Sequence, residues 1–311
     1  MKRLFLAIGL LASLPACTAE PAPEAPAAAA CTIDPDARLR WADWSPDMDA
    51  KGGTTFTYTG CGKQLVFVAA RHGNISDSPT FNAVRDAIAD GPDLVLLEGV
   101  PAARGDSYGK LLDYAEGVAG KPTDNEAMLT ARTAHAAGIP FRGAEPLDTD
   151  VIMETRAAGL SDRDLLGFYM LRQLPQMQRG GAYDDLSDPR MEGVVADIAP
   201  YFADELGLAA TEAEALDTMP EFAAWYADFN GEDFVSGFEP PDTYPSTAVE
   251  DPRASNFASD TVADARDAFI LAQVRDALAA HDHVLIVYGG SHHSVLRPAL
   301  EAAFGAATAS P

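Results

Sequence analysis

The sequence predicts an α/β protein with a mostly parallel central sheet, flanking helices and a helical insertion. Two apolar stretches rich in Val, at residues 64–68 and 284–288, are typical of strands covered on both faces. A helical pattern at residues 76–90 follows the first stretch and precedes a similar one at 93–100. Residues 148–256 then change character and carry helix-capping signals, which predicts the insertion.

The composition is that of an ordinary globular protein with an acidic surface. The chain has 311 residues, enough for one large or two small domains, and 47% are hydrophobic. The net charge of −25 and the pI near 4.4 argue against a nucleic-acid partner, because phosphates are bound by stripes of Lys and Arg. The acidic residues are spread evenly, so we interpret them as a solvated surface.

The first 17 residues have the pattern of a bacterial lipoprotein signal peptide. Two basic residues precede an apolar run at residues 4–14 that is too short to span a bilayer. The run ends in Leu-Pro-Ala-Cys, which resembles a lipobox and predicts lipidation of Cys17; ordinary cleavage near Ala16 is the alternative. Thr18 favours the outer membrane. We therefore expect an exported protein that faces the periplasm and contacts the membrane through its lipid anchor only.

Residues 18–30 are mostly Ala, Pro and Glu, which predicts a disordered tether before a folded domain at residues 31–307. Two cysteines remain, Cys31 and Cys61. Because export leads to an oxidising compartment, we expect a disulfide between them that pins the start of the domain beside the first core strand. No His lies at ligand spacing, so zinc binding at these cysteines is not expected.

The first part of the domain predicts a βαβ unit. Residues 54–58 alternate and are rich in β-forming residues, and a glycine-flanked turn leads from them into the core strand at 64–68. The helix at 76–90 then connects to the strand at 93–100. A strand, a helix and a strand with short links form a βαβ unit, so we expect the two strands to pair in parallel through a right-handed crossover.

Two further elements complete this half of the sheet. Residues 105–121 are rich in Gly and charge, which predicts a loop with a short helix. Residues 123–137 predict a helix, and 141–146 a short strand whose polar end forms a third wall of the candidate site.

The insertion is predicted from its own helix signals. Capping patterns at Ser161 and Thr211 each precede apolar residues, and residues 191–206 form another helical run. Residues 231–253 contain four prolines and predict a long loop, of the kind that often forms a lid or a binding loop. A helix at 260–280 leads back into the sheet.

Histidines follow two of the predicted strands. His72 comes after the first core strand, and His292 and His293 come after the strand at 284–288, just before a closing helix at 298–304. Ligands bind at the carboxyl ends of strands in α/β sheets, so we expect the fold to bring these two strand ends together. Adjacent histidines point different ways, and we favour His292 for the site; a solvated turn with incidental histidines is the alternative.

Carboxylates and arginines add further candidates. Glu98, and more weakly Glu145, ends a predicted strand, where a carboxylate is costly unless it is paired, hydrated or functional. Arg266 lies on the apolar face of the helix at 260–280. Three interpretations are open for its charge. The side chain extends to solvent, or it pairs with a site carboxylate such as Glu98, or it binds a substrate oxyanion. Arg132 is a weaker candidate of the same kind.

Other common catalytic patterns are absent from the sequence. It has no Gly-x-Ser-x-Gly, P-loop or dinucleotide-binding fingerprint and no pairing of Cys with His as a nucleophile. Ser291 lies beside His292, but nothing in the sequence indicates that it is activated.

Together the motifs resemble the TraB/GumN/Tiki family, which belongs to a wider set with the haem-binding lipoprotein ChaN and the erythromycin esterases. The resemblance covers about residues 64–304 and places His72, Glu98, Arg266 and His292 on the motif positions. It implies an EreA/ChaN-like fold. Because Tiki members are described as metal-dependent proteases, it also implies a divalent metal (Mn, Co or Zn) held by both histidines and the glutamate.

One position departs from the family pattern. The Gly-x-x-His motif is intact at Gly289–His292, but the first motif reads Ala69-Ala70-Arg71-His72. Its His-Gly ending is closer to the erythromycin esterase branch, which suggests acid–base chemistry without a metal as an alternative.

Three functions therefore compete. The leading hypothesis is a metal-dependent, peptidase-like hydrolase acting on a peptide or small molecule, in which Glu98 helps to activate water and Arg266 orients Glu98 or stabilises the oxyanion. The second is a haem- or ligand-binding lipoprotein without turnover, with Tyr288, His292 and His293 as axial ligands. The third is a peptide-sequestering protein with a degenerate site.

Overall fold

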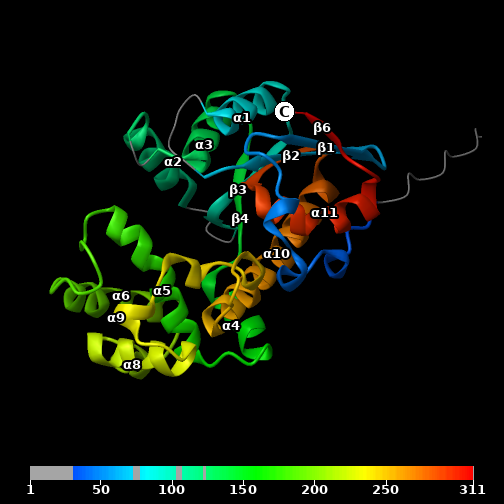
Figure 1. Ribbon diagram of the computed structural model, residues 1–311. Coiled ribbons are helices and arrows are strands. Elements are labelled where there is room, and N and C mark those ends of the chain that lie inside the picture. The colour runs from blue at the N-terminus through cyan, green and yellow to red at the C-terminus, as the bar shows by residue number, and fades with distance from the viewer. Residues whose placement is uncertain (1–30, 73–77, 103–106, 122–123, 311) are drawn as a thin grey trace, which may run out of the picture.

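The computed structural model describes residues 31–72, 78–102, 107–121 and 124–310, and it confirms the predicted α/β class (Figure 1). Its six-stranded sheet has the order β4-β3-β5-β2-β1-β6. The first four of these strands are parallel, and β1 and β6 extend one edge antiparallel. The strands are β1 (Thr55–Gly60), β2 (Lys63–Ala70), β3 (Leu94–Pro101), β4 (Phe141–Glu145), β5 (His283–Gly289) and β6 (Thr308–Ser310).

Helices cover both faces of this sheet (Figure 1). Along β5, Leu285 and Val287 pack towards α1 and α3, whereas Val284, Ile286 and Tyr288 pack towards α10 and α11. This alternation follows from the period of two in a strand, and both sets are apolar because both faces are buried. The helices are α1 (Pro79–Ala89), α2 (Ser107–Val118), α3 (Glu126–Ala136), α10 (Ala254–Ala280) and α11 (Gly290–Phe304).

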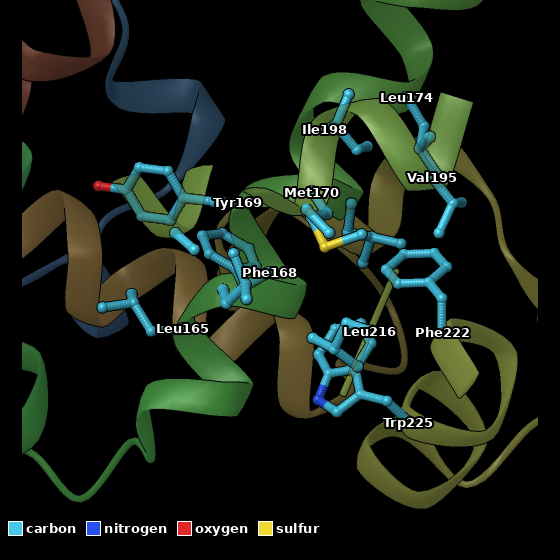
Figure 2. Packing of buried hydrophobic residues seen from close by; sticks show 14 of the residues in the cluster. Leu165, Phe168, Tyr169, Met170, Leu174, Val195, Ile198, Leu216, Phe222 and Trp225 are labelled. Atoms are coloured by element: carbon cyan, nitrogen blue, oxygen red, sulfur yellow. The ribbon is translucent and has the colours of Figure 1, made fainter. Parts of the chain in front are cut away.

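The insertion forms a helical lobe with its own core beside the sheet (Figure 1). Figure 2 shows this core, in which residues of α5, α6 and α8 such as Phe168, Val195 and Trp225 surround Met170. Burial of such side chains is worth about 1.5–3 kcal/mol each, which lets the lobe hold its shape. Its helices are α4 (Asp148–Ala157), α5 (Asp162–Arg179), α6 (Met191–Glu205), α7 (Ala210–Glu214), α8 (Met219–Asn230) and α9 (Phe234–Gly237).

Helix α10 joins the two cores. Ala258 and Val262, in its first half, belong to the core of the insertion, while Ile270 and Val274, in its second half, belong to the core under the sheet. The apolar face of one long helix is thus shared between two lobes. Residues in the middle of α10 consequently face the boundary where the sheet meets the insertion.

The amino-terminal segment is attached to the sheet at two points. The predicted Cys31–Cys61 disulfide is present and links residue 31 to the turn between β1 and β2. Three short 3-10 helices follow, η1 (Pro35–Ala37), η2 (Trp41–Asp43) and η3 (Pro46–Met48), before Gly53 donates a backbone hydrogen bond to Ala69 in β2. The predicted signal peptide, the lipidation of Cys17 and the tether at 18–30 lie outside the described residues. None of the described helices is both long enough and apolar enough to cross a membrane.

Helix α11 starts earlier than predicted. It begins at Gly290, so His292 and His293 lie in the first turn of a helix rather than in a turn before residue 298. The two glycines suggested a turn, and Pro298 suggested a helix start because proline is common at the first helical position. In the structure Pro298 lies inside the helix.

Other predicted boundaries change as well. Thr211 does not cap a helix; Ala209 precedes α7, and Thr218 caps α8 by accepting a hydrogen bond from the Glu221 backbone. The predicted loop at 231–253 contains α9 and the 3-10 helices η4 (Pro240–Thr243) and η5 (Ser246–Ala248). Helix α2 fills most of the region predicted as a loop with a short helix.

The topology of the βαβ unit also has an unpredicted feature. Strands β2 and β3 are parallel, but the predicted pairing between them is wrong, because β5 lies between them and pairs with both. Periodicity cannot reveal such an insertion, because it reports which faces are buried and not which strands are neighbours. Strand β6 pairs with β1 beyond the predicted domain end at residue 307.

The packing of Gly167 in α5 predicts a measurable effect on stability. A Cβ at Gly167 would lie 2.4 Å from the indole of Trp225, which is itself buried and donates a hydrogen bond to Asp164. We expect Gly167→Ala to lower the free energy of unfolding by about 1–3 kcal/mol, measured by urea denaturation.

Gly193→Ala is the matched control for this prediction. Gly193 lies on the exposed face of α6, and a Cβ there would meet nothing within 4 Å. Its replacement should stabilise the protein by up to about 1 kcal/mol, because Ala is the better helix former. Equal effects of the two substitutions would contradict the packing described for α5.

Candidate functional site

The carboxyl ends of three neighbouring strands bring the predicted residues together. In the register of the sheet, Ala70 of β2 lies beside Gly289 of β5, and Leu97 of β3 lies beside Val287 of β5. His72, Glu98 and His292 follow these positions and line one cavity. The predicted meeting of the two histidine-bearing strand ends is therefore confirmed.

His72 lies between two carboxylates. Its Nδ1 is hydrogen-bonded to Oε1 of Glu126, and its Nε2 lies 3.6 Å from Oε1 of Glu98. The hydrogen bond to Glu126 raises the pKa of His72 to about 9; burial opposes this shift, and the charge of Glu98 adds to it. His72 is thus an imidazolium at neutral pH, with one N–H directed towards the cavity.

His292 is held in a different way. Its Nδ1 lies 2.6 Å from Oδ1 of Asp267, a completely buried carboxylate that also accepts a hydrogen bond of 2.7 Å from the indole of Trp41. The carboxylate accepts a hydrogen bond from Nδ1 of His292, so in the neutral ring Nε2 is the nitrogen with the lone pair. Nε2 makes no hydrogen bond to any part of the chain that the structure describes. It is the ring nitrogen available for a ligand or a proton.

Gly289 explains how these groups can converge. Its backbone N–H donates a hydrogen bond of 2.7 Å to Oε2 of Glu98. A Cβ at Gly289 would lie 3.4 Å from both Cδ2 of His292 and Nε2 of His72, and 3.6 Å from Oε2 of Glu98. The three groups surround this glycine, where a side chain would occupy the space between them. The glycine of the second motif therefore leaves the space between the three groups open.

Arg266 forms its ion pair with Glu145. The sequence suggested Glu98 as a possible partner. Nε and Nη2 of Arg266 donate to the two carboxylate oxygens of Glu145 at 3.0 and 2.6 Å, and Arg266 lies 3.9 Å from Glu98. Glu145 also accepts hydrogen bonds from the hydroxyl of Tyr288 and the backbone of Gly99. Burial alone would raise the pKa of Glu145, but the Arg266 charge and these hydrogen bonds lower it to about 2.

Three secondary candidates lie outside the cavity. His293 is buried on the other side of α11, where its Nε2 is 2.9 Å from the hydroxyl of Tyr58 and its ring stacks on Phe56 at 3.7 Å. Arg132 holds Asp124 with hydrogen bonds of 2.8 and 2.9 Å. Tyr288 is fully buried behind the site, with its hydroxyl directed at Glu145.

Ala69 is the position that departs from the family motif. Its side chain fits into the structure without a close contact to Gly290. It is buried in β2, and a Cβ at Gly290 would lie 3.7 Å from its methyl group, an ordinary contact distance. The methyl group of Ala69 would thus have room even beside a Cβ at residue 290. Ala69 is therefore compatible with the observed position of His72.

The cavity that contains both histidines has a volume of 530 Å³. It is bounded by the strand ends, α10, α5 of the insertion and the segment 243–245. Asn256 fixes this segment by donating to the carbonyls of Pro241 and Tyr244, at 2.8 and 2.9 Å. The segment thus forms a preformed wall. The cavity is lined by Trp41, His72, Glu98, Arg172, Gln176, Thr243, Tyr244, Pro245, Ser259, Val262, Ala263, Arg266, Ser291 and His292.

Sequence reasoning did not assign roles to Glu126, Asp267, Trp41 or Arg172. Glu126 occupies the first turn of α3, where an acidic residue is common for its interaction with the helix dipole, so its position gave no signal. Asp267 lies in the interior of α10 three residues before the buried Ile270, which could have indicated a buried carboxylate. Trp41 comes from a distant segment that no local pattern connects to the site.

His72, Glu98 and His292 are residue types that bind metal ions, but their positions in the structure do not form a metal site. Metal-binding histidines commonly donate their second N–H to a carboxylate, as Nδ1 of His72 and Nδ1 of His292 do with Glu126 and Asp267. Yet no three His, Cys, Asp or Glu residues within the described ranges are grouped so that they could hold a metal ion. Metal binding by His72, Glu98 and His292 therefore stays a prediction.

Comparisons with known proteins returned no match: neither a family model, nor a curated protein, nor a solved structure is similar to this chain at a significant level. The resemblance to the TraB/GumN/Tiki family consequently rests on the motif residues alone.

The environments of His293 and His72 predict a pH dependence of stability. Burial lowers the pKa of His293 from 6.5 to about 3. Between these values the unfolded state binds a proton that the folded state does not, so the free energy of unfolding falls as the pH falls, by at most about 1.4 kcal/mol per pH unit. The effect of His72 on the free energy of unfolding has the opposite sign. Its stabilising contribution is present below pH 6.5 and is lost as the pH rises towards 9. Its effect is smaller, since 63% of its side chain is exposed and screened.

Urea denaturation at pH 7.0 and 5.0 tests the assignment to His293. The loss of stability between these values should be smaller in His293→Gln than in the unchanged protein, because Gln does not titrate. His135→Gln removes an exposed histidine at the end of α3 and should leave the pH dependence unchanged. An identical pH dependence in His293→Gln would contradict the buried neutral state of His293.

Proposed function

We propose that the protein is a hydrolase that adds water to the acyl group of a peptide-like substrate. The observation that carries this proposal is a pair of imidazoles, His72 and His292, each oriented by a buried carboxylate from another helix, on either side of Glu98. Enzymes use such carboxylate–histidine pairs to fix the tautomer of a ring nitrogen that moves a proton.

The different environments of the histidines suggest different roles. Nε2 of His292 has a free lone pair and faces the cavity, so it takes a proton from water as the water oxygen bonds to the acyl carbon. Nε2–H of His72 then donates a proton to the leaving group as the acyl bond breaks. The step ends with His292 protonated and His72 neutral, and solvent restores both.

Glu98 and Arg266 support this chemistry. Glu98 is held by the backbone of Gly289 and lies beside Nε2 of His72, where it orients the proton donor and the attacking water. Arg266 has two of its nitrogens bound to Glu145, while its Nη1 donates to no described residue. Nη1 is therefore the donor that can stabilise an oxyanion in the cavity.

A divalent metal is compatible with the same roles for the protein groups. His72, Glu98 and His292 would hold the ion, with Glu126 and Asp267 orienting the histidines. When bound, it would lower the pKa of a water molecule and polarise the scissile carbonyl.

The two non-catalytic alternatives have less support. Of the three axial haem ligands considered, Tyr288 and His293 are hydrogen-bonded to buried partners, and only His292 lines the cavity. A degenerate, peptide-sequestering site would not need two separately buried carboxylates to orient its histidines, since keeping Asp267 completely buried costs free energy.

Hydrolysis assays test the proposal directly. The purified chain should release p-nitrophenol from p-nitrophenyl esters or cleave a mixed peptide library analysed by mass spectrometry. We expect His292→Asn to lower kcat/KM by about 10²–10⁴-fold, the usual contribution of a general base. His135→Asn, which changes an exposed histidine outside the cavity, should retain full activity. Equal rates for His292→Asn and the unchanged protein, or no hydrolysis of any probe, would refute the proposal.

Dialysis against EDTA separates the metal-dependent form of this proposal from the metal-free one. Loss of activity that returns with Mn²⁺, Co²⁺ or Zn²⁺ would support metal catalysis. Activity that survives in protein shown by elemental analysis to contain no stoichiometric metal would support acid–base catalysis by the histidines alone.

A further inference from the structure

A second arginine lines the cavity. Arg172 lies on α5 of the insertion and lines the cavity that contains His72 and His292. The proposed catalytic groups come from the sheet and from the helices packed on it, whereas Arg172 comes from the insertion. It therefore adds a positive charge from a different lobe to the cavity where a substrate would lie.

Arg172 has no counter-ion among the described residues. No carboxylate of the described chain lies within 4.0 Å of its guanidinium group, whose Cζ lies 5.8 and 5.9 Å from the ring centroids of Phe168 and Tyr169. The acids closest to it are already occupied: Glu145 binds Arg266, and Asp148 accepts a hydrogen bond from the hydroxyl of Tyr169.

This situation is unlike that of comparable arginines in the protein. Arg132, Arg253 and Arg266 are also partly buried, and each of them binds a carboxylate at 2.6–3.0 Å. Arginine stays protonated in proteins, so the Arg172 cation cannot avoid its charge by losing a proton. Burial lowers the pKa of Arg172, and the nearby charge of Arg266 lowers it further, which is the expected sign for an uncompensated cation.

An unpaired arginine facing a cavity suits an anionic ligand. Its planar guanidinium group matches the two oxygens of a carboxylate with parallel hydrogen bonds. Gln176, one turn further along α5, lines the same wall, and its side-chain amide makes no hydrogen bond to a described residue. The net charge of −25 repels anions in general, so a local cation is needed to admit one.

We infer that the substrate carries a carboxylate bound by Arg172, as in a peptide hydrolysed close to its free C-terminus. This inference rests on the proposed hydrolase function, and it adds the chemical class of the substrate. In this arrangement α5 selects the substrate through its charge, and the residues at the strand ends carry out the reaction. Arg172 is then a specificity-determining residue in contact with substrate.

Binding measurements test the inference without depending on turnover. The probes are N-acetyl-alanyl-alanine and its C-terminal amide, which differ in the carboxylate only, titrated by NMR into the purified chain carrying His292→Asn. We expect the free acid to bind at least tenfold more tightly than the amide. Adding Arg172→Gln should abolish this difference, and adding Arg172→Lys should retain part of it, because Lys keeps the charge without the bidentate geometry.

Arg163→Gln is the matched control, since Arg163 is an exposed arginine on the same helix that does not line the cavity. It should preserve the preference for the free acid. Equal binding of acid and amide, or a preference that persists in Arg172→Gln, would overturn the inference. Binding of inorganic phosphate in place of the free acid would overturn the assignment of a carboxylate.

Kinetics with the active protein distinguish failure of this inference from failure of the proposed function. If peptides with free and amidated C-termini are cleaved at equal kcat/KM, the hydrolase proposal stands and the carboxylate specificity is wrong. If neither is cleaved but the free acid still binds through Arg172, the anion site stands and the hydrolase proposal is wrong.

Discussion

The ion pair between Arg266 and Glu145 is the interaction on which the site depends. Glu145 ends β4, and its carboxylate also accepts hydrogen bonds from Tyr288 of β5 and the backbone of Gly99 at the end of β3. One buried carboxylate thus fixes α10 against three strands. Removal of one partner from such a pair leaves an uncompensated buried charge and typically costs 3–5 kcal/mol. Asp267, the next residue of α10, then has a fixed position from which to orient His292.

The sequence was sufficient to predict the fold class and most residues at the strand ends. Apolar runs and glycines identified β2, β3 and β5, and the polar residues at or near the carboxyl ends of these runs included His72, Glu98 and His292. The insertion of β5 between β2 and β3 could not be predicted, because strand order depends on tertiary packing that no local periodicity records. The contacts of the histidines with Glu126 and Asp267 could not be predicted for a similar reason, because these partners lie 54 and 25 residues away from them.

The contrast between His292 and His293 shows why a histidine pair cannot be assigned from its sequence alone. Successive residues of a helix point about 100° apart, so the first turn of α11 directs one ring into the cavity and the other into the core. In the cavity, His292 is hydrogen-bonded to Asp267 through Nδ1, and its Nε2 makes no hydrogen bond to a described residue. His293 meets Tyr58 and Phe56, and burial lowers its pKa. The decisive fact was that a helix, and not an irregular turn, begins at Gly290.

The disulfide between Cys31 and Cys61 has a consequence for orientation. Cys61 precedes the amino end of β2, whereas the cavity with His72 lies beyond its carboxyl end. The strand has eight residues, which separates the two ends by about 23 Å at 3.3 Å per residue. Residue 31 is therefore held at the end of β2 away from the cavity. A label or support coupled at residue 31 would lie well away from the residues that line the cavity.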